Sequence, residues 1–460
     1  MQNNKYAIII FVPALIILIS LLCMNTGIFI HSKTNAKPPP NVIIIGIDTL
    51  RADHLGFAEY KNTAPNIEKL AAQSAVFTNA FSTSSWTLPS FHSILTSLYP
   101  SSHGVKYDTH RISNSTTTFA EIMKRNGYRT AGFICGPYLK SIFGFNQGFD
   151  LYDEHLSSIK QPDSHKDITS EKLTNSAIFW LKKHGNKKFF LFLHYWDPHY
   201  DYIPPKPFDR IFDPEYTGSI DGTNIQKSSK INPDMDKRDL DHILALYDGE
   251  IMWTDSHIGR LLDYLKVSGL FKNTIIVVTS DHGEEFLDHG DKSHRKTLYN
   301  EVIHVPLMFK IPGIDNPAKD KSLVSTVDIM PTVLNALNIK YGIDTDGISL
   351  IPIITKKHNQ ITRTIYSELY HKVMSINLVC IIKDGWKLIY DYYTKESKLY
   401  NIDIDMQEKN NLININTQQA QDLKDELFDW LNQKKTQQKN VPEVIFDDET
   451  MNHLKSLGYV

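Results

Sequence analysis

Hydrophobic residues gather in short continuous runs along most of the chain, and polar residues bound each run. Runs at 42–47, 188–194 and 274–280 are rich in β-branched or aromatic residues, which is typical of strands buried on both faces of a parallel sheet. Shorter runs at 129–134, 307–310 and 324–329 continue the series. The pattern predicts a sheet built from many sequentially distant segments.

Helical spacing of apolar residues fills the intervals between these runs. Phe91, Ile94, Leu95 and Leu98 follow the i, i+3, i+4, i+7 pattern of a buried helix face, and Pro89 suits a first helical turn. Segments 119–126 and 240–265 predict two more helices. Because strands and helices alternate from 41 to about 340, we expect an α/β domain with a large, mostly parallel sheet flanked by helices.

The pattern of apolar and polar residues changes near residue 354. Segments 363–369, 378–383 and 385–393 read as short strands separated by turns, and 417–433 reads as a final helix. We therefore expect an α/β domain over 41–354. A C-terminal subdomain over 355–460 would hold a small antiparallel sheet and a helix.

The first 24 residues hold an apolar run without charge, which begins at Tyr6 after Lys5. It is about long enough to span a bilayer and lacks a small-x-small cleavage site, so a signal-anchor is favoured over a cleaved signal. Residues 25–40 form a proline-rich tether. With Lys5 on the cytoplasmic side, the catalytic domain would lie outside the cytoplasm, in a periplasmic or extracellular space.

Charge and cysteine content narrow the functional classes. The net charge of −3 and the absence of a clustered basic segment argue against nucleic acid as a partner. The chain has three cysteines and no CxxC spacing, which argues against a cysteine zinc site. Cys135 and Cys380 could pair or stay free.

Polar residues follow several of the predicted strands directly. Asp48 ends the first run, Asp281 and His282 end the run 274–280, and His194 and His199 lie at the end of 188–194. Open α/β sheets bind ligands at the carboxyl ends of their strands. Each residue could also have a purely structural role, since Asp often caps turns, Thr often caps helices and His194 could simply end a strand.

The presence of these polar groups at the ends of several predicted strands indicates a catalytic site. Two carboxylates, an imidazole and the hydroxyl of Thr87, just before a helix N-terminus, would form a mononuclear site for one divalent metal ion, with imidazole favouring Zn²⁺ or Mn²⁺ over Ca²⁺. A bound cation would lower the pKa of the Thr87 hydroxyl and make it a nucleophile.

Ordered motifs along the chain support this reading. They include NVIIIGIDTLRADHLG, SWTLPSFHSILTSLYPSSHGV, HYWDPHYDYIPP, TSDHGEEFLDHG, KTLYNEVIHVPL and KLYNIDIDMQEKNNL. Over essentially all of residues 41–460 the sequence resembles the sulfatase family of the alkaline phosphatase superfamily. The resemblance implies an alkaline-phosphatase-like fold and a bound metal, Ca²⁺ by analogy with the family.

The resemblance also implies a role for individual residues. Asp48, Asp281 and His282 match metal ligands, and Thr87 matches the nucleophile, which also touches the metal. Lys296 matches a lysine that contacts the transferred group. His199 matches a histidine near the leaving group and is a candidate general acid, as is His294 to a lesser degree.

One departure from the family bears on the reaction. The family's nucleophile lies in a Cys/Ser-x-Pro-x-Arg frame and becomes formylglycine, whereas this frame runs from Thr87 to Phe91 as TLPSF. Threonine cannot become formylglycine by that route. The pattern is closer to threonine-nucleophile branches of the superfamily, which include phosphoethanolamine and phosphoglycerol transferases.

Three functions follow from these observations. The leading hypothesis is a metal-dependent hydrolase of sulfate or phosphate esters that acts through Thr87, on a glycan or a lipid head group. The second is a membrane-anchored transferase that works through a phosphothreonine. The third is a binding protein that has kept the fold, which the intact Asp48, Thr87, Asp281, His282 and Lys296 argue against.

Overall fold

The computed structural model describes residues 38–56, 60–157, 168–314, 318–357, 362–437 and 439–446, with Asp448, Met451, Leu454 and Lys455 beyond them. The predicted signal-anchor at 1–24 and nearly all of the tether lie outside the described residues, so both stay predictions. Among the residues that the structure does describe, no helix is long and apolar enough to cross a bilayer.

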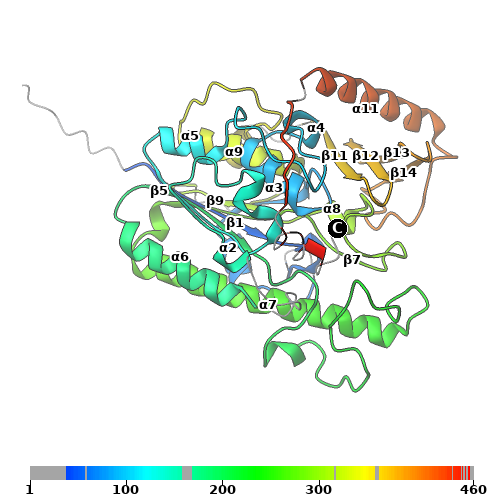
Figure 1. The fold of residues 1–460 in the computed structure, drawn as a ribbon, viewed down its shortest axis with the longest axis horizontal. Helices are drawn as coiled ribbons and strands as arrows, with labels where there is room; N and C mark the ends of the chain where they lie inside the picture. Colours follow the sequence, from blue (N-terminus) through cyan, green and yellow to red (C-terminus); the bar gives the residue numbers. More distant parts are fainter. Residues whose placement is uncertain are drawn as a thin grey trace, which may run out of the picture. The chain divides into compact units, whose positions relative to one another are not determined.

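An eight-stranded sheet forms the centre of the unit that runs from Pro40 to Val460 (Figure 1). Its order is β10-β2-β9-β6-β1-β5-β3-β4, and β9 runs antiparallel to both of its neighbours. This confirms the predicted mixed, mostly parallel sheet. The strands are β1 (Asn41–Ile47), β2 (Ala75–Phe81), β3 (Arg129–Phe133), β4 (Leu151–Asp153), β5 (Phe189–Tyr195), β6 (Thr274–Ser280), β9 (Leu307–Lys310) and β10 (Ala318–Ser325).

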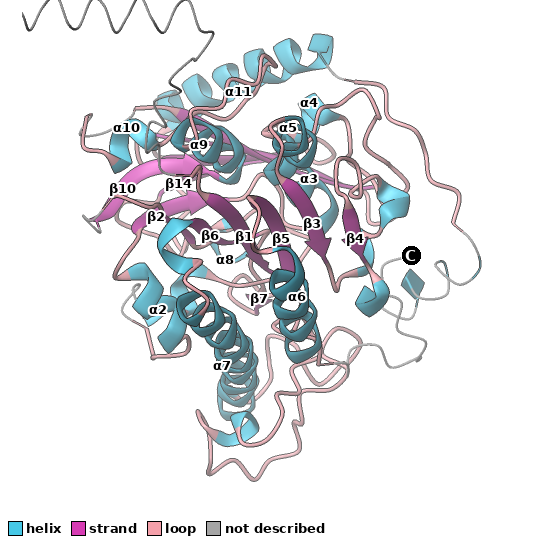
Figure 2. Cartoon of the chain, turned by 90° about the vertical axis from the view of Figure 1, so that its left-hand side faces the viewer, coloured by secondary structure: helices cyan, strands magenta, loops and turns pink. Residues whose placement is uncertain are grey.

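Helices cover both faces of this sheet (Figure 2). One face carries α2 (Pro65–Ala71), α6 (Ser170–His184) and α7 (Lys237–Val267), and the other carries α3 (Thr87–Thr96), α5 (Phe119–Arg125) and α9 (Ile329–Ala336). Short helices α4 (Pro100–His103), α8 (Asn300–Ile303) and α10 (Ile351–Ile354) complete this part of the chain. Because helices lie on both faces, every residue of β1, β5 and β6 is buried, which explains their continuous apolar sequence.

A four-stranded antiparallel sheet follows, as predicted, with the order β11-β12-β13-β14. Its strands are β11 (Thr364–His371), β12 (Ile376–Lys383), β13 (Trp386–Asp391) and β14 (Ser397–Asn401), and the final helix is α11 (Thr417–Gln437). The β11 strand contacts the segment between β2 and α3, where Glu368 N–H donates to the Thr83 carbonyl at 2.8 Å. The C-terminal sheet is therefore anchored close to Thr87.

The structure corrects the predicted strand at 324–329. Strand β10 ends at Ser325, a 3-10 turn covers Thr326–Asp328, and α9 begins at Ile329. A capping box ends the strand, because the Asp328 carboxylate accepts the Ser325 N–H at 2.9 Å. Cys135 and Cys380 are both buried and free, so the two cysteines do not pair.

Candidate active site

The parallel register of β1 and β6 brings Asp48 and Asp281 together. Ile47 pairs with Ser280, so the residue after each strand emerges at the same edge of the sheet. Ser280 Oγ ties the two strand ends together, since it lies 2.6 Å from the Ile47 carbonyl oxygen and accepts the Leu50 N–H at 3.0 Å. Both carboxylates are buried. The sheet therefore dictates this carboxylate pair.

Thr87 reaches the same place from α3. It is the first helical residue and follows the N-cap position, Trp86, which makes no side-chain cap. The predicted position just before the helix is thus one residue off. Thr87 Oγ1 lies 3.3 Å from His282 Nε2 and is buried. A hydroxyl at a ten-residue helix's N-terminus faces free N–H groups and the positive end of the macrodipole, which favour an anionic ligand.

The tautomer of His282 suits a metal ligand. Its Nδ1–H donates to the Gly283 carbonyl at 2.8 Å, which leaves the Nε2 lone pair facing the cluster. Nε2 lies 3.3 Å from Asp281 Oδ2 and 3.6 Å from Asp48 Oδ1. An imidazole lone pair directed at two carboxylates and a hydroxyl calls for a cation between them.

The donor set fits a divalent cation. Ligand atoms of Asp48, Asp281 and His282 all lie within 4.8 Å of one another. Asp48 Oδ1 and both carboxylate oxygens of Asp281 are buried and find no hydrogen-bond partner among the residues that the structure describes. Burial raises the pKa of Asp48 to about 7, and burial together with Asp48 raises that of Asp281 to about 7. Unpaired buried carboxylates are costly, and a bound cation would remove that cost.

These pKa shifts predict a pH-dependent stability difference in metal-free protein. The pKa of Asp281 is about 7 in the fold and near 3.8 when unfolded, so the folded state binds more protons between these values. The contribution of Asp281 to the free energy of unfolding therefore falls as pH rises from 4 to 7. We expect the melting temperature of Asp281→Asn, relative to wild type, to rise over this interval in chelator. A difference in melting temperature that stays the same from pH 4 to 7 would contradict the raised pKa of Asp281.

His194 orients Asp48. It pairs with Gly46 across β1 and β5, and its Nε2 lies 3.2 Å from Asp48 Oδ2. Gly136 N–H donates to His194 Nδ1 at 3.3 Å, so Nε2 carries the proton and donates to the carboxylate. Burial lowers the pKa of His194 to about 4, which keeps the ring neutral. The sequence alone favoured a strand-closing residue here, and the contact with Asp48 is what that reading missed.

Removing this contact should weaken metal binding. His194→Phe keeps the ring volume between neighbouring aromatic side chains and deletes the N–H that holds Asp48. We expect about a 10- to 100-fold weaker metal affinity by titration calorimetry, the usual effect of losing a group that orients a ligand. His92→Phe is the matched control, because His92 is a buried histidine on α3 that stacks on Phe145. Equal loss in both variants would indicate general destabilisation.

A second group of polar residues borders the cluster. Glu284 accepts the Tyr202 hydroxyl at 3.0 Å and lies 3.0 Å from His294 Nδ1. The His294 ring centroid lies 4.4 Å from that of His282 and 5.1 Å from that of His199. Burial raises the pKa of Glu284 to about 8. Of the two predicted acid candidates, His294 thus lies beside His282, and His199 lies beside His294. Glu284 directly follows the DHG motif and was missed by the sequence reading.

Lys296 lies near this group, but its ammonium is engaged elsewhere. It forms an ion pair with Asp291 and donates to the Lys292 carbonyl at 3.2 Å. The predicted contact of Lys296 with a transferred group therefore stays a prediction. The neighbouring Arg295 places its guanidinium 4.3 Å from the ring centroid of Trp86, which fixes the loop that carries His294 to the start of α3.

Phe91 fills the place of the arginine in the family's frame. Its ring packs edge-on against His194, with centroids 5.0 Å apart. A Cβ at Gly46 would lie 2.7 Å from this ring, so β1 needs glycine there. The position serves packing behind His194 and offers no charge to the site.

Two family models match the chain. The Sulfatase model matches residues 40–339, and the model for the C-terminal region of N-sulphoglucosamine sulphohydrolase matches residues 288–437. An ulvan-active sulfatase of Formosa agariphila is 26% identical over 74% of this chain and 70% of its own length. An arylsulfatase of Clostridium perfringens is 27% identical, over 82% and 90% respectively.

A solved structure shares the fold. The phosphonate monoester hydrolase of Agrobacterium radiobacter superposes with a TM-score of 0.73 at 21% identity, over 86% of this chain and 96% of that one. This likeness confirms the alkaline-phosphatase-like fold. The chain belongs to the sulfatase family and is a hydrolase of sulfuric or phosphoric esters.

Proposed function

We propose that this protein is a metal-dependent ester hydrolase in which Thr87 is the nucleophile and no formylglycine is used. The observation that carries the proposal is the position of Thr87 Oγ1, 3.3 Å from His282 Nε2 at the N-terminus of α3. Enzymes of the family depend on a metal, and the buried group of Asp48, Asp281 and His282 offers the ligands. The metal's identity stays open between Zn²⁺, Mn²⁺ and Ca²⁺.

Thr87 and the candidate acids His199 and His294 take different steps of the proposed ester cleavage. A bound divalent cation would lower the pKa of the Thr87 hydroxyl and offset negative charge on the transferred group. Thr87 Oγ1 attacks phosphorus or sulfur, and the bond to the alcohol oxygen breaks. We assign to His199 or His294 the proton that this oxygen takes up, because the His294 ring lies 4.4 Å from that of His282 and 5.1 Å from that of His199. Water then cleaves the ester on Thr87 and regenerates the hydroxyl.

The chemistry of this last step favours phosphate over sulfate. Formylglycine can release sulfate by collapse of a hemiacetal, whereas an ester on threonine must be hydrolysed at phosphorus or sulfur. The relatives include both kinds of enzyme, an ulvan-active sulfatase and a phosphonate monoester hydrolase. We propose a phosphate ester or phosphonate monoester as the better substrate, and a sulfate ester as the alternative.

A product assay tests the proposal. Metal-loaded protein is offered matched aryl phosphate, phosphonate and sulfate esters, with and without glycerol or ethanolamine as an acceptor. We expect free phosphate or phosphonate as the product, at a rate that the acceptor does not change. A product esterified to the acceptor would show that the protein is a transferase and not a hydrolase. A protein that cleaves none of the esters would favour a binding function.

Membrane attachment with the catalytic unit outside the cytoplasm is part of this proposal. Its support is the uncharged apolar run that follows Lys5 in the sequence. After expression of the full chain, the protein should stay in the membrane pellet through an alkaline carbonate wash. Release into the supernatant would contradict an anchor.

A further inference from the structure

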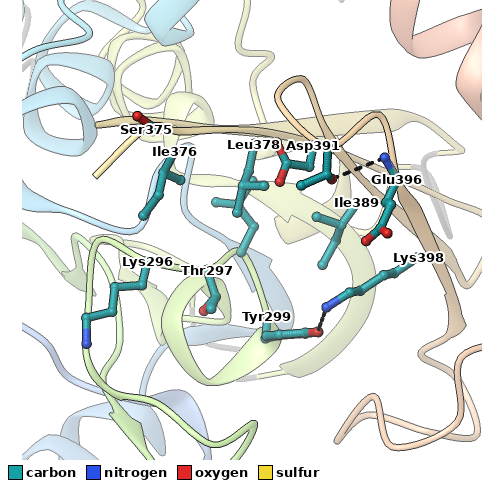
Figure 3. Close-up of a pocket in the computed structure, with 12 residues that line it drawn as sticks. Lys296, Thr297, Tyr299, Ser375, Ile376, Leu378, Ile389, Asp391, Glu396 and Lys398 are labelled. Atoms are coloured by element: carbon teal, nitrogen blue, oxygen red, sulfur yellow. Dashed lines mark hydrogen bonds between the residues drawn. The ribbon is translucent and has the colours of Figure 1, made fainter. Parts of the chain in front are cut away.

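A pocket of about 240 Å³ lies between the loop that follows His294 and the C-terminal antiparallel sheet. The loop contributes residues 296–299, and β12, β13 and β14 contribute the opposite wall (Figure 3). The full lining is Lys296, Thr297, Leu298, Tyr299, Ser375, Ile376, Leu378, Ile389, Asp391, Thr394, Glu396 and Lys398. The pocket therefore lies at the junction of this loop and the C-terminal sheet.

The inner wall is apolar and the charged groups stand at its margin. Ile376, Leu378 and Ile389 extend from β12 and β13 into the space above Tyr299 (Figure 3). Lys398 Nζ donates to the Tyr299 hydroxyl at 2.7 Å, and Asp391 Oδ1 accepts the Tyr393 N–H at 2.7 Å. Two lysines and two carboxylates line the pocket, so their charges balance. This composition suits an uncharged, mainly apolar group.

Lys296 connects the pocket to the active site. It is two residues from His294, whose ring lies 4.4 Å from that of His282. Lys296 itself lines the pocket, so the loop that carries His294 runs from beside His282 to the pocket. A substrate whose ester group lies at Thr87 could extend its alcohol portion past Lys296 into this space.

The aromatic group in the lining is not arranged for stacking on a sugar. Tyr299 stacks against His289 at 3.6 Å between centroids with 9° between planes, so one ring face is covered. Exposed apolar residues lie instead on the turns beside Ser375 and Thr394, namely Val373, Met374 and Tyr393 at 83%, 48% and 57% exposure.

We propose that this pocket binds the alcohol portion of the substrate and selects an alcohol that carries an apolar alkyl or aryl group. The inference rests on the proposed hydrolase function, because it takes the ester group to lie at Thr87. It narrows the substrate from any sulfate or phosphate ester to an amphiphilic one, with a polar head at the metal cluster and an apolar body against β12 and β13.

A homologous series measures this selectivity. Phenyl, 4-methylphenyl, 4-ethylphenyl and 4-propylphenyl esters are compared, as whichever of phosphate, phosphonate or sulfate the enzyme cleaves. We expect kcat/KM to rise about fourfold for each methylene group that the pocket buries. Leu378→Trp, which fills the pocket, should flatten the series, so that the ratio of the 4-propylphenyl to the phenyl ester falls toward one. Val267→Trp is the control, because Val267 is exposed at the end of α7, outside the lining, and the series should keep its slope.

A binding measurement separates this inference from the function on which it rests. Calorimetric titration with 4-propylphenol should give binding to wild type and Val267→Trp, and at least tenfold weaker binding to a folded Leu378→Trp. Turnover with a flat series and no phenol binding would overturn the pocket assignment and leave the hydrolase intact. Absence of turnover with the expected phenol binding would overturn the hydrolase instead. Preference for a sugar ester that Leu378→Trp abolishes would show a glycan site here.

Discussion

Thr87→Ala is expected to lower kcat/KM by about 10⁴-fold, because the variant loses the atom that forms the covalent ester. The fold should not suffer, since the hydroxyl makes its one described contact with His282 and gives α3 no cap. Thr87→Ser keeps an oxygen at this position and should retain activity within about tenfold. Steady-state kinetics on the best aryl ester measure both effects.

Thr96→Ala is the matched control for this result. Thr96 is a buried threonine at the other end of α3, and its hydroxyl donates to the His92 carbonyl at 2.6 Å. Its loss should change the melting temperature more than the rate. If Thr87→Ala kept more than about a tenth of wild-type kcat/KM, water would be the nucleophile and the covalent route would be wrong.

Removing the metal, or Asp281 as its proposed ligand, should have the second largest effect on activity and stability. Chelation is expected to abolish turnover, and adding back a divalent metal at 100 times its Kd should stabilise the wild-type fold by about 2.7 kcal/mol. In Asp281→Asn both effects should vanish. Metal-free Asp281→Asn should melt above metal-free wild type at pH 8, since the substitution removes a buried charge beside Asp48.

A second buried carboxylate controls for the loss of charge alone. Glu250 lies on α7, is buried, and accepts the Ile203 N–H at 2.9 Å. It is not one of the three residues of the Asp48, Asp281 and His282 cluster. Glu250→Gln should keep the stabilisation by metal. Thermal melts of both variants, with and without metal, measure this stabilisation. If metal stabilised Asp281→Asn as much as wild type, Asp281 would not be a ligand.

The fold could be predicted from the sequence where burial on both faces leaves a continuous apolar signal. Strand β6 and strand β9 have the predicted bounds, and the strong runs at β1 and β5 were recognised because helices cover both sides. Strand β2 was missed because its sequence AVFTNAF is interrupted by Thr78 and Asn79, which are half-buried near the sheet edge. The 324–329 error arose at a capping box that side-chain hydrogen bonds create.

The site could be predicted only in part, for a related reason. Asp48 and Asp281 stand directly after strongly patterned strands, so their meeting follows from the rule that parallel strands end at one edge. The link from His194 to Asp48 depends on strand register and on Phe91 packing behind the ring, which local pattern does not encode. The ion pair of Lys296 with Asp291 likewise depends on the path of a loop.

Mass spectrometry of the trapped intermediate tests the central claim most directly. Metal-loaded protein is mixed with an aryl phosphate or aryl sulfate, quenched in acid within one turnover, digested and sequenced. The account predicts a phospho adduct on Thr87 from the aryl phosphate, or a sulfo adduct if the aryl sulfate is the substrate, in the peptide that contains TLPSF, and none in Thr87→Ala. Full turnover with Thr87 unmodified at every quench time, or an adduct on another residue, would contradict it.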